Sequence, residues 1–140
     1  MAGPAALVEA LGVTTPNYIG KNRLDYLVEV DSEETVRKLQ PDLALLKTVP
    51  CRGVIVTSRT ASPAFDFVSR FFAPNVGVDE DSVTGSAHCC LGPYWRTRLN
   101  KKSFTAYQAS SRGGVVRVQL EDNRVKLSGQ AVTVLRGELV

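Results

Sequence analysis

The sequence is poor in the residues that bind transition metals. It has one histidine, His88, and three cysteines, and no Cys-x-x-Cys spacing occurs in its 140 residues. Structural zinc sites use four cysteine or histidine ligands, commonly in that spacing, so we expect no metal site. The cysteines are Cys51, Cys89 and Cys90, and adjacent cysteines rarely pair with each other for geometric reasons. We therefore expect reduced thiols, as in cytoplasmic proteins.

A strong charge excess and a long apolar run are also missing. The 17 basic and 14 acidic residues leave a net charge of +3, and no basic stripe is interleaved with aromatic residues, so nucleic acid is not an expected partner. The first twelve residues have neither a basic start nor a long apolar stretch, so we predict neither a signal peptide nor a membrane span. A chain of 140 residues with 44% hydrophobic residues has the size of one compact domain with its own core.

Hydrophobic periodicity predicts a mixed domain of the α+β class. Strands are predicted at 24–30, 53–58, 64–72, 104–109, 115–120, 124–127 and 131–135. Helices are predicted at 5–11, at 41–46, and between a capping box at Asp31 and Glu34 and about Leu39. Segment 73–84 is rich in Pro, Gly, Asp and Asn, which predicts a loop. Because helices and strands do not alternate strictly, α+β is favoured over a parallel doubly wound sheet.

A more apolar helix is predicted to begin at Ser86. One face carries apolar side chains at helical spacing: Ala87, Cys90, Leu91, Tyr94 and Trp95. Cys89 and Gly92 widen that face, so the helix should be largely buried. Pro93 removes a backbone hydrogen bond in mid-helix and should kink it. The pattern therefore predicts six or seven strands around one central apolar helix.

The loop before this helix carries a candidate anion site. Gly85 lets the backbone approach a ligand closely, and the first turn of a helix leaves backbone N–H groups without partners. The amides of Gly85, Ser86 and Ala87 lie at the positive end of the helix dipole, which suits a carboxylate or a phosphate. The hydroxyls of Thr84 and Ser86 add possible donors.

Other residues of this segment have competing interpretations. Asp81 is either a helix cap, worth about 1 kcal/mol, or a functional group. Beside a bound carboxylate it would favour its protonated form, which suits a general acid. His88 is more often a packed or exposed helix residue than a catalyst, and near a helix start it tends to stay neutral. A nucleophilic Cys89 or Cys90 would need a second histidine to activate it, and the sequence has none.

The same residues form a recognisable pattern. It comprises Arg70-Phe71-Phe72-Ala73-Pro74, Gly77, Glu80-Asp81-x-Val83-Thr84-Gly85-Ser86-Ala87-His88, the segments 111–114 and 124–132, and Gly137. This pattern resembles the PhzF-like isomerases, relatives of diaminopimelate epimerase and proline racemase, over nearly the whole chain. The resemblance implies two similar lobes, each a curved sheet around one central helix, with the active site between them. It further implies proton transfer on a small carboxylate with no metal or organic cofactor.

The resemblance also assigns roles. It implies that Asp81 and Ser86 are catalytic, and that Thr84, Gly85, Ser86, Ala87 and His88 bind substrate. Two departures from the family pattern matter. Position 82 is serine where the family commonly has proline, which would leave the loop around Asp81 less stiff.

The second departure is length, because chains of this family are about twice as long. We expect residues 1–140 to form a single C-terminal lobe, without the N-terminal lobe that carries the family's general-base carboxylate and a Gly-His-Pro-type motif. The prediction is thus an isomerase with half of its site. The alternative is a non-catalytic paralogue that binds a small anion or acts as a dimeric interaction protein, since an unpartnered lobe exposes apolar surface.

Overall fold

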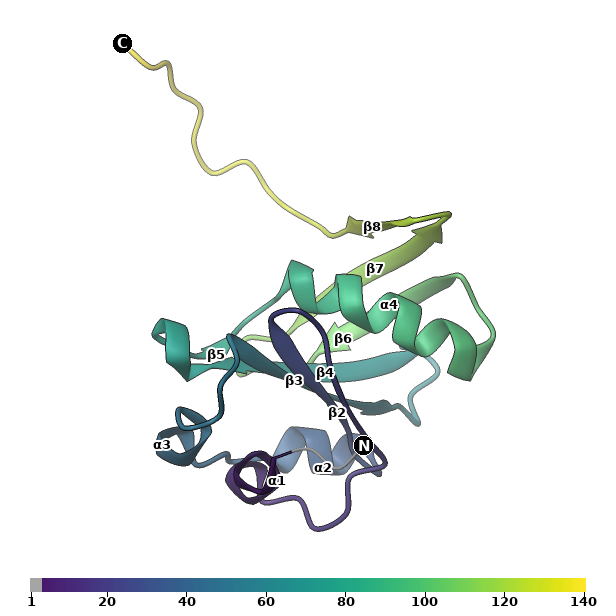
Figure 1. Cartoon of the computed structure of the whole chain (residues 1–140). Helices are drawn as coiled ribbons and strands as arrows, with labels where there is room; N and C mark the ends of the chain where they lie inside the picture. Colours follow the sequence, from purple (N-terminus) through teal and green to yellow (C-terminus); the bar gives the residue numbers. More distant parts are fainter. Residues whose placement is uncertain (1–3) are drawn as a thin grey trace.

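The computed structural model describes residues 4–140 and contains one mixed sheet of eight strands (Figure 1). The strands are β1 Tyr18–Lys21, β2 Asp25–Glu29, β3 Gly53–Arg59, β4 Phe67–Ala73, β5 Val78–Asp81, β6 Ser103–Gln108, β7 Gly114–Glu121 and β8 Arg124–Ser128. They are ordered β1-β2-β3-β4-β6-β7-β8, and β5 also pairs with β4. The β2–β3 and β4–β6 pairs are parallel, and the others are antiparallel. The predicted α+β class is confirmed.

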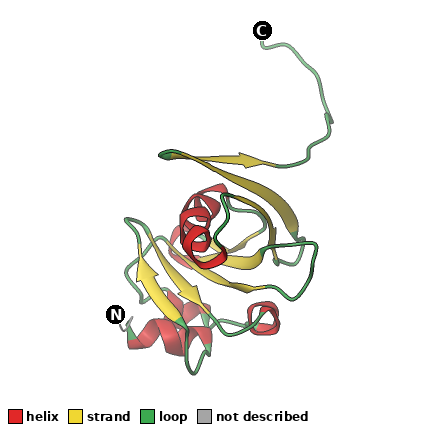
Figure 2. Cartoon of the chain, turned by 90° about the vertical axis from the view of Figure 1, so that its right-hand side faces the viewer, coloured by secondary structure: helices red, strands yellow, loops and turns green. Residues whose placement is uncertain are grey.

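Helices cover both faces of this sheet (Figure 1). They are α1 Ala5–Leu11, α2 Glu33–Lys38, α3 Leu43–Leu46, the 3-10 turn η1 Pro74–Val76, and α4 Gly85–Leu99. The first three helices share one hydrophobic core with the sheet, and α4 shares a second core with its other face. Figure 2 shows the strands curving around α4. No helix within residues 4–140 is long and apolar enough to cross a membrane.

The central strands are buried on both faces, which explains their nearly continuous apolar sequence. On β4, Phe67 and Phe71 point into the core with α4, while Val68 and Phe72 point into the core with α1 and α2. This strand begins at Phe67 rather than at residue 64. Phe65 lies before it and stacks on Tyr107 with ring centroids 5.0 Å apart, so Phe65 does not share the face of Phe67.

Helix α4 runs through Pro93 to Leu99 and begins one residue earlier than predicted, at Gly85. Its buried residues are Ala87, His88, Leu91, Gly92 and Trp95. Cys89 is exposed and does not widen the buried face. Compared with the predicted face, the buried face keeps Gly92 and leaves out Cys89. Strand β7 passes close to Gly92, where a Cβ would lie 3.0 Å from Cγ1 of Val118.

Two local predictions near the ends of elements were wrong. Ser32, rather than Asp31, caps α2: its Oγ accepts a hydrogen bond from the Thr35 backbone N–H at 3.2 Å. Ser32 has the extended backbone that an N-cap needs, while Asp31 instead accepts from the Thr35 hydroxyl at 2.6 Å. The predicted loop 73–84 contains η1 and the short strand β5, because the backbone of β5 finds partners on β4.

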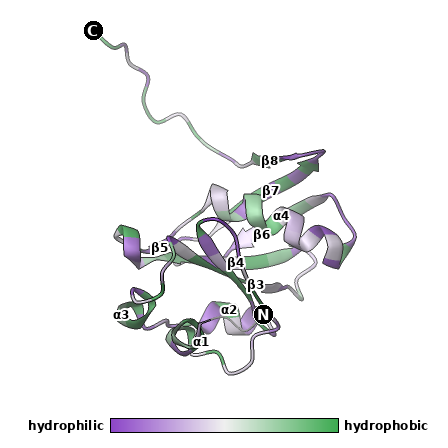
Figure 3. Cartoon of the chain, viewed as in Figure 1, coloured by the Kyte–Doolittle hydropathy of each residue, from purple (hydrophilic) through white to green (hydrophobic). Residues whose placement is uncertain are grey.

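The strand predicted at 131–135 does not form within this chain. Beyond β8 the backbone extends away from the domain, and several of the residues along it are hydrophobic (Figure 3). Val132 is 84% exposed and Val134 is 90% exposed. A strand forms only where a neighbouring edge satisfies its N–H and C=O groups, and within residues 4–140 this tail meets no such edge.

Candidate functional site

One buried glutamine holds the loop between β5 and α4. Gln108, the last residue of β6, donates from Nε2 to the main-chain oxygen of Asp81 at 2.9 Å and to Oγ1 of Thr84 at 3.0 Å. Its Oε1 accepts from the Thr84 backbone N–H at 2.7 Å. Because β6 is fixed between β4 and β7, the sheet determines the conformation of this loop.

Thr84 is the N-cap residue of α4, yet its hydroxyl makes no capping bond to the helix. It donates to Oδ2 of Asp81 at 2.7 Å. Asp81 lies three residues before the N-cap, and its side chain accepts from Thr84 rather than from a helix amide. Without a capping hydrogen bond from the Thr84 side chain, the first amides of α4 keep the donor capacity that an anion requires.

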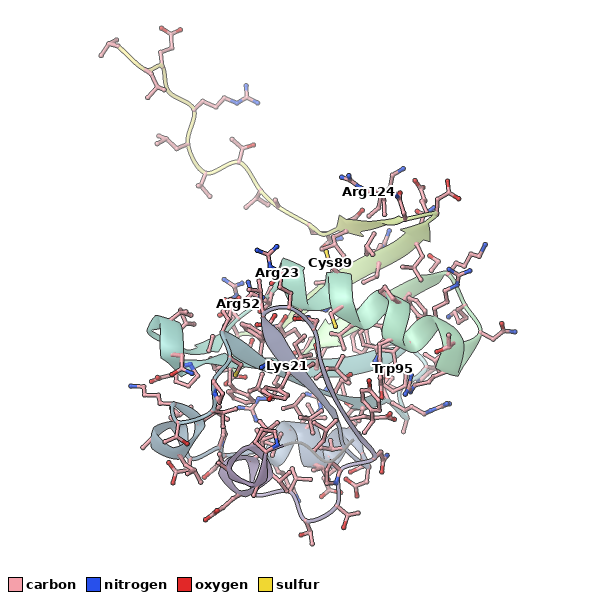
Figure 4. All side chains as sticks on the ribbon, in the orientation of Figure 1. Lys21, Arg23, Arg52, Cys89, Trp95 and Arg124 are labelled. Carbon is pink, nitrogen blue, oxygen red and sulfur yellow. The ribbon has the colours of Figure 1, made fainter. Side chains whose placement is uncertain are left out.

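Ser86 faces a cationic group. Nη2 of Arg52, just before β3, donates to Oγ of Ser86 at 3.0 Å. The guanidinium also forms a two-point ion pair with Asp25, with Nε 2.8 Å from Oδ1. Hydrogen bonding to the buried Asp25 carboxylate holds the pKa of Arg52 above its usual value. Figure 4 shows Arg52 at the end of the sheet where α4 begins.

His88 is fully buried beneath this loop. Its Nδ1 lies 2.7 Å from the main-chain oxygen of Thr84, and its ring stacks on Phe67 at 6.3 Å. Burial lowers the pKa of His88, so the ring is neutral at pH 7 and Nδ1 is the donor to Thr84. Nε2 has no partner within residues 4–140. His88 therefore contacts the loop by its hydrogen bond to the Thr84 carbonyl, and its ring is not exposed at the surface.

A second loop braces the first. The hydroxyl of Ser110 donates to the main-chain oxygen of Ser82 at 2.8 Å and accepts from the Gly113 N–H at 3.0 Å. Gly114 packs directly on Val83, where any Cβ would collide with the valine. Glycine is therefore required for the two loops to approach this closely.

An open cavity of about 750 Å³ lies between these loops and the end of β8. Gly85 and Val83 line one side, and the second loop and β7 line the other. Arg112 and Arg117 are also part of the lining and give the cavity a positive side. The helix start is therefore reached from a solvent-filled space that is large enough for a small molecule.

The structure brings Asp81, Thr84, Gly85 and Ser86 together, as their spacing in the sequence implied. Sequence reasoning missed Gln108 and Arg52. One signal for Gln108 was available, because it falls at an inward position of an alternating strand after Phe104 and Ala106. A polar residue at such a position is normally there to make hydrogen bonds.

Comparisons with known proteins identify the class to which this fold belongs. The family model described as phenazine biosynthesis-like protein matches residues 8–137. An uncharacterized isomerase from Halalkalibacterium halodurans is 56% identical over 137 residues, which cover 98% of this chain and 51% of that protein. An uncharacterized isomerase from Pseudomonas aeruginosa is 49% identical over 138 residues, covering 99% and 52%.

A solved structure agrees with these sequence matches. The putative phenazine biosynthesis PhzC/PhzF protein from Clostridium difficile has a TM-score of 0.85 at 35% identity, and the match covers 99% of this chain and 52% of that one. This chain belongs to the phenazine biosynthesis-like family, and the predicted resemblance is confirmed. The chain spans about half the length of the relatives that it matches.

Proposed function

We propose that this chain supplies one half of an isomerase site, which binds a small carboxylate and transfers a proton without a metal or an organic cofactor. The observation that carries the proposal is the placement of Asp81. Its carboxylate accepts from Thr84, the first residue of a helix start that has no side-chain cap. The neighbouring Val83 and Gly85 line an open cavity. Family membership and relatives named as isomerases support the reaction class.

The proposed roles follow from the geometry. Amides of Gly85, Ser86 and Ala87 bind the substrate carboxylate. Thr84 and His88, which the family resemblance made substrate-binding residues, hold the helix start in place instead, because the Thr84 hydroxyl donates to Asp81 and His88 is fully buried. The Ser86 hydroxyl accepts from Arg52, so its own proton is free to donate to the ligand. Asp81 exchanges a proton with the substrate. A second carboxylate must act from the opposite side, and we assign it to the lobe that pairs with this one.

Anion binding tests the first half of this proposal. Acetate and inorganic phosphate, titrated into the ¹⁵N-labelled chain, are expected to shift the amide resonances of residues 85–87 to saturation. Gly85→Pro removes one amide donor at a position where a helix tolerates proline. A hydrogen bond to a charged group contributes about 1.5–3 kcal/mol, so this variant should bind at least roughly tenfold more weakly.

Gly85→Ala is the matched control, because it keeps the N–H. A Cβ at this position would lie 3.6 Å from Cδ1 of Leu127, an ordinary contact. This variant should bind acetate as the unmodified chain does. Amides 85–87 that do not respond to either anion, or a Gly85→Pro variant that binds normally, would contradict the proposed site.

The exposed tail favours a second candidate, a dimeric interaction protein. Val132 and Val134 would share one face if this tail paired as a strand, and both are almost fully exposed. We expect the chain to self-associate at micromolar concentration, as measured by sedimentation equilibrium. Lysine at both positions should raise the dissociation constant at least tenfold, because it places charge on the buried side of the contact. Thr133→Lys, on the opposite side, is the control, and a chain that remains monomeric contradicts the candidate.

A further inference from the structure

All of the side-chain hydrogen bonds of Gln108 enter the loop that carries Asp81. Its side chain is fully buried, and it contacts the loop at three points: the Asp81 main-chain oxygen, the Thr84 backbone N–H and the Thr84 hydroxyl. A buried amide with all of its bonds in one short loop fixes that loop in a single arrangement.

The orientation of this amide follows from its neighbours. The Thr84 backbone N–H can only donate, and the Asp81 main-chain oxygen can only accept. If the amide were reversed, its NH2 group would face the Thr84 N–H and its oxygen would face the Asp81 oxygen, and both contacts would be repulsive. Gln108 therefore presents Oε1 to the Thr84 N–H and the NH2 group to the Thr84 hydroxyl.

This orientation fixes the direction of the next hydrogen bond. Because Gln108 Nε2 has no acceptor lone pair available, the Thr84 hydroxyl must accept from it. The single hydroxyl proton of Thr84 then points to Oδ2 of Asp81, 2.7 Å away. The hydrogen bonds run in one direction, from Gln108 through Thr84 to Asp81. Within residues 4–140, the side-chain hydrogen bond of Asp81 is made by Oδ2 and none is made by Oδ1.

We infer that Gln108 is a positioning residue for the proton transfer, one that turns the Thr84 hydroxyl onto Oδ2 and leaves Oδ1 of Asp81 as the oxygen that exchanges the proton. This inference rests on the proposed function. When Asp81 acts as the acid, the Oδ1–H bond breaks and its electron pair stays on the carboxylate. The substrate supplies the electron pair for its new bond to hydrogen. The proton of Thr84 stays on Oγ1 and stabilises the carboxylate that is formed.

Substitutions separate this role from simple packing. Gln108→Glu has the same shape, but its carboxylate cannot donate, so the Thr84 hydroxyl turns toward position 108 and away from Asp81. Thr84→Val removes the hydroxyl at nearly constant volume and keeps the backbone bond to Gln108. Thr84→Ser keeps both the hydroxyl and its direction, and it is the conservative variant expected to restore function.

The test combines a spectrum of the free protein with a rate. The ¹³Cγ resonance of Asp81 at pH 8 should move in both Gln108→Glu and Thr84→Val and should stay in place in Thr84→Ser. Deuterium exchange from solvent into small α-carboxylate compounds, measured with the lobe that supplies the second carboxylate present, should show at least a tenfold lower kcat in the first two variants. Their KM should stay within about threefold of the original, because neither position supplies an amide to the ligand.

Each outcome decides one part of the inference. An unchanged Asp81 resonance in Gln108→Glu, or a kcat that Thr84→Val leaves intact, overturns the positioning role. A fall in kcat that Thr84→Ser shares also overturns it, because packing alone would then account for the effect. If the unmodified chain exchanges no deuterium with that lobe present, although the resonance moves as expected, the proposed proton transfer fails and the direction of the hydrogen bonds stands by itself.

Discussion

Replacing Trp95 by alanine is expected to destabilise the fold by about 3–5 kcal/mol, the range for truncation of a fully buried large aromatic residue. Trp95 is 0% exposed, and its ring stacks on Phe67 with centroids 5.7 Å apart. Its Nε1–H donates to Oγ1 of Thr57 at 3.1 Å. Truncation would therefore open a cavity between α4 and β3 and remove a buried hydrogen bond. Urea unfolding followed by circular dichroism measures the change, since Trp95 is the only tryptophan.

Two control variants make this experiment specific. Trp95→Phe keeps most of the buried ring and removes the N–H, so we expect a smaller loss than for alanine. The Thr57 hydroxyl still donates to Val68 O at 2.7 Å in that variant. Arg96→Ala changes the neighbouring exposed residue of α4 and should alter stability by no more than about 0.5 kcal/mol. A loss below about 1.5 kcal/mol in Trp95→Ala would mean that α4 is not the centre of its core.

Asp81→Asn is expected to reduce deuterium exchange into small α-carboxylate compounds by at least about a hundredfold, because positioned acids and bases contribute roughly 10²–10⁴ to such rates. Asparagine has the same shape and its side-chain oxygen can still accept from Thr84. It cannot give or take a proton at neutral pH. The loss should therefore fall on kcat rather than on the binding of the carboxylate. Mass spectrometry of the compounds in deuterated buffer, with the lobe that supplies the second carboxylate present, provides the rate.

The matched control is Asp79→Asn, an exposed acid two residues away on β5. It removes the same charge and should leave the rate unchanged. Equal rates for Asp81→Asn and the unmodified chain would contradict the proton-transfer role of Asp81. A chain that exchanges no deuterium even with the lobe that supplies the second carboxylate present would favour the dimeric, non-catalytic candidate, which the sedimentation experiment tests independently.

Local sequence signals were sufficient where a residue interacts with close neighbours. Helix α1 spans Ala5–Leu11, the range predicted for it, and Gly12 ends it in a left-handed backbone conformation. The β-branched run 53–58 lies in β3, which is buried along almost its full length. The β7–β8 hairpin also forms, and Asp122 in its turn has a positive φ of 47°. Each of these features depends on backbone preferences or apolar patterns within a few residues.

Features that depend on distant partners were not predictable in this way. Gln108 and Thr84 are 24 residues apart, and Arg52 and Ser86 are 34 apart. Neither pair leaves a mark in a local pattern. The tail at 131–135 has the composition of a strand, and its conformation depends on whether a sheet edge lies within reach. Composition alone also could not choose between capping and another role for Asp81.

The sequence by itself determined the α+β class, the apolar central helix, the family pattern, and the presence of a carboxylate and two hydroxyl groups close to Gly85. The tertiary structure decided which hydrogen bonds those groups make. It brought β6 beside β4 and thereby placed the buried amide of Gln108 under the loop, which gave the hydrogen bonds around Asp81 their direction. The physical reason is that a side chain in a fully buried site must satisfy its donors and acceptors with whatever the fold places nearby. Those neighbours come from strands that the chain order does not reveal.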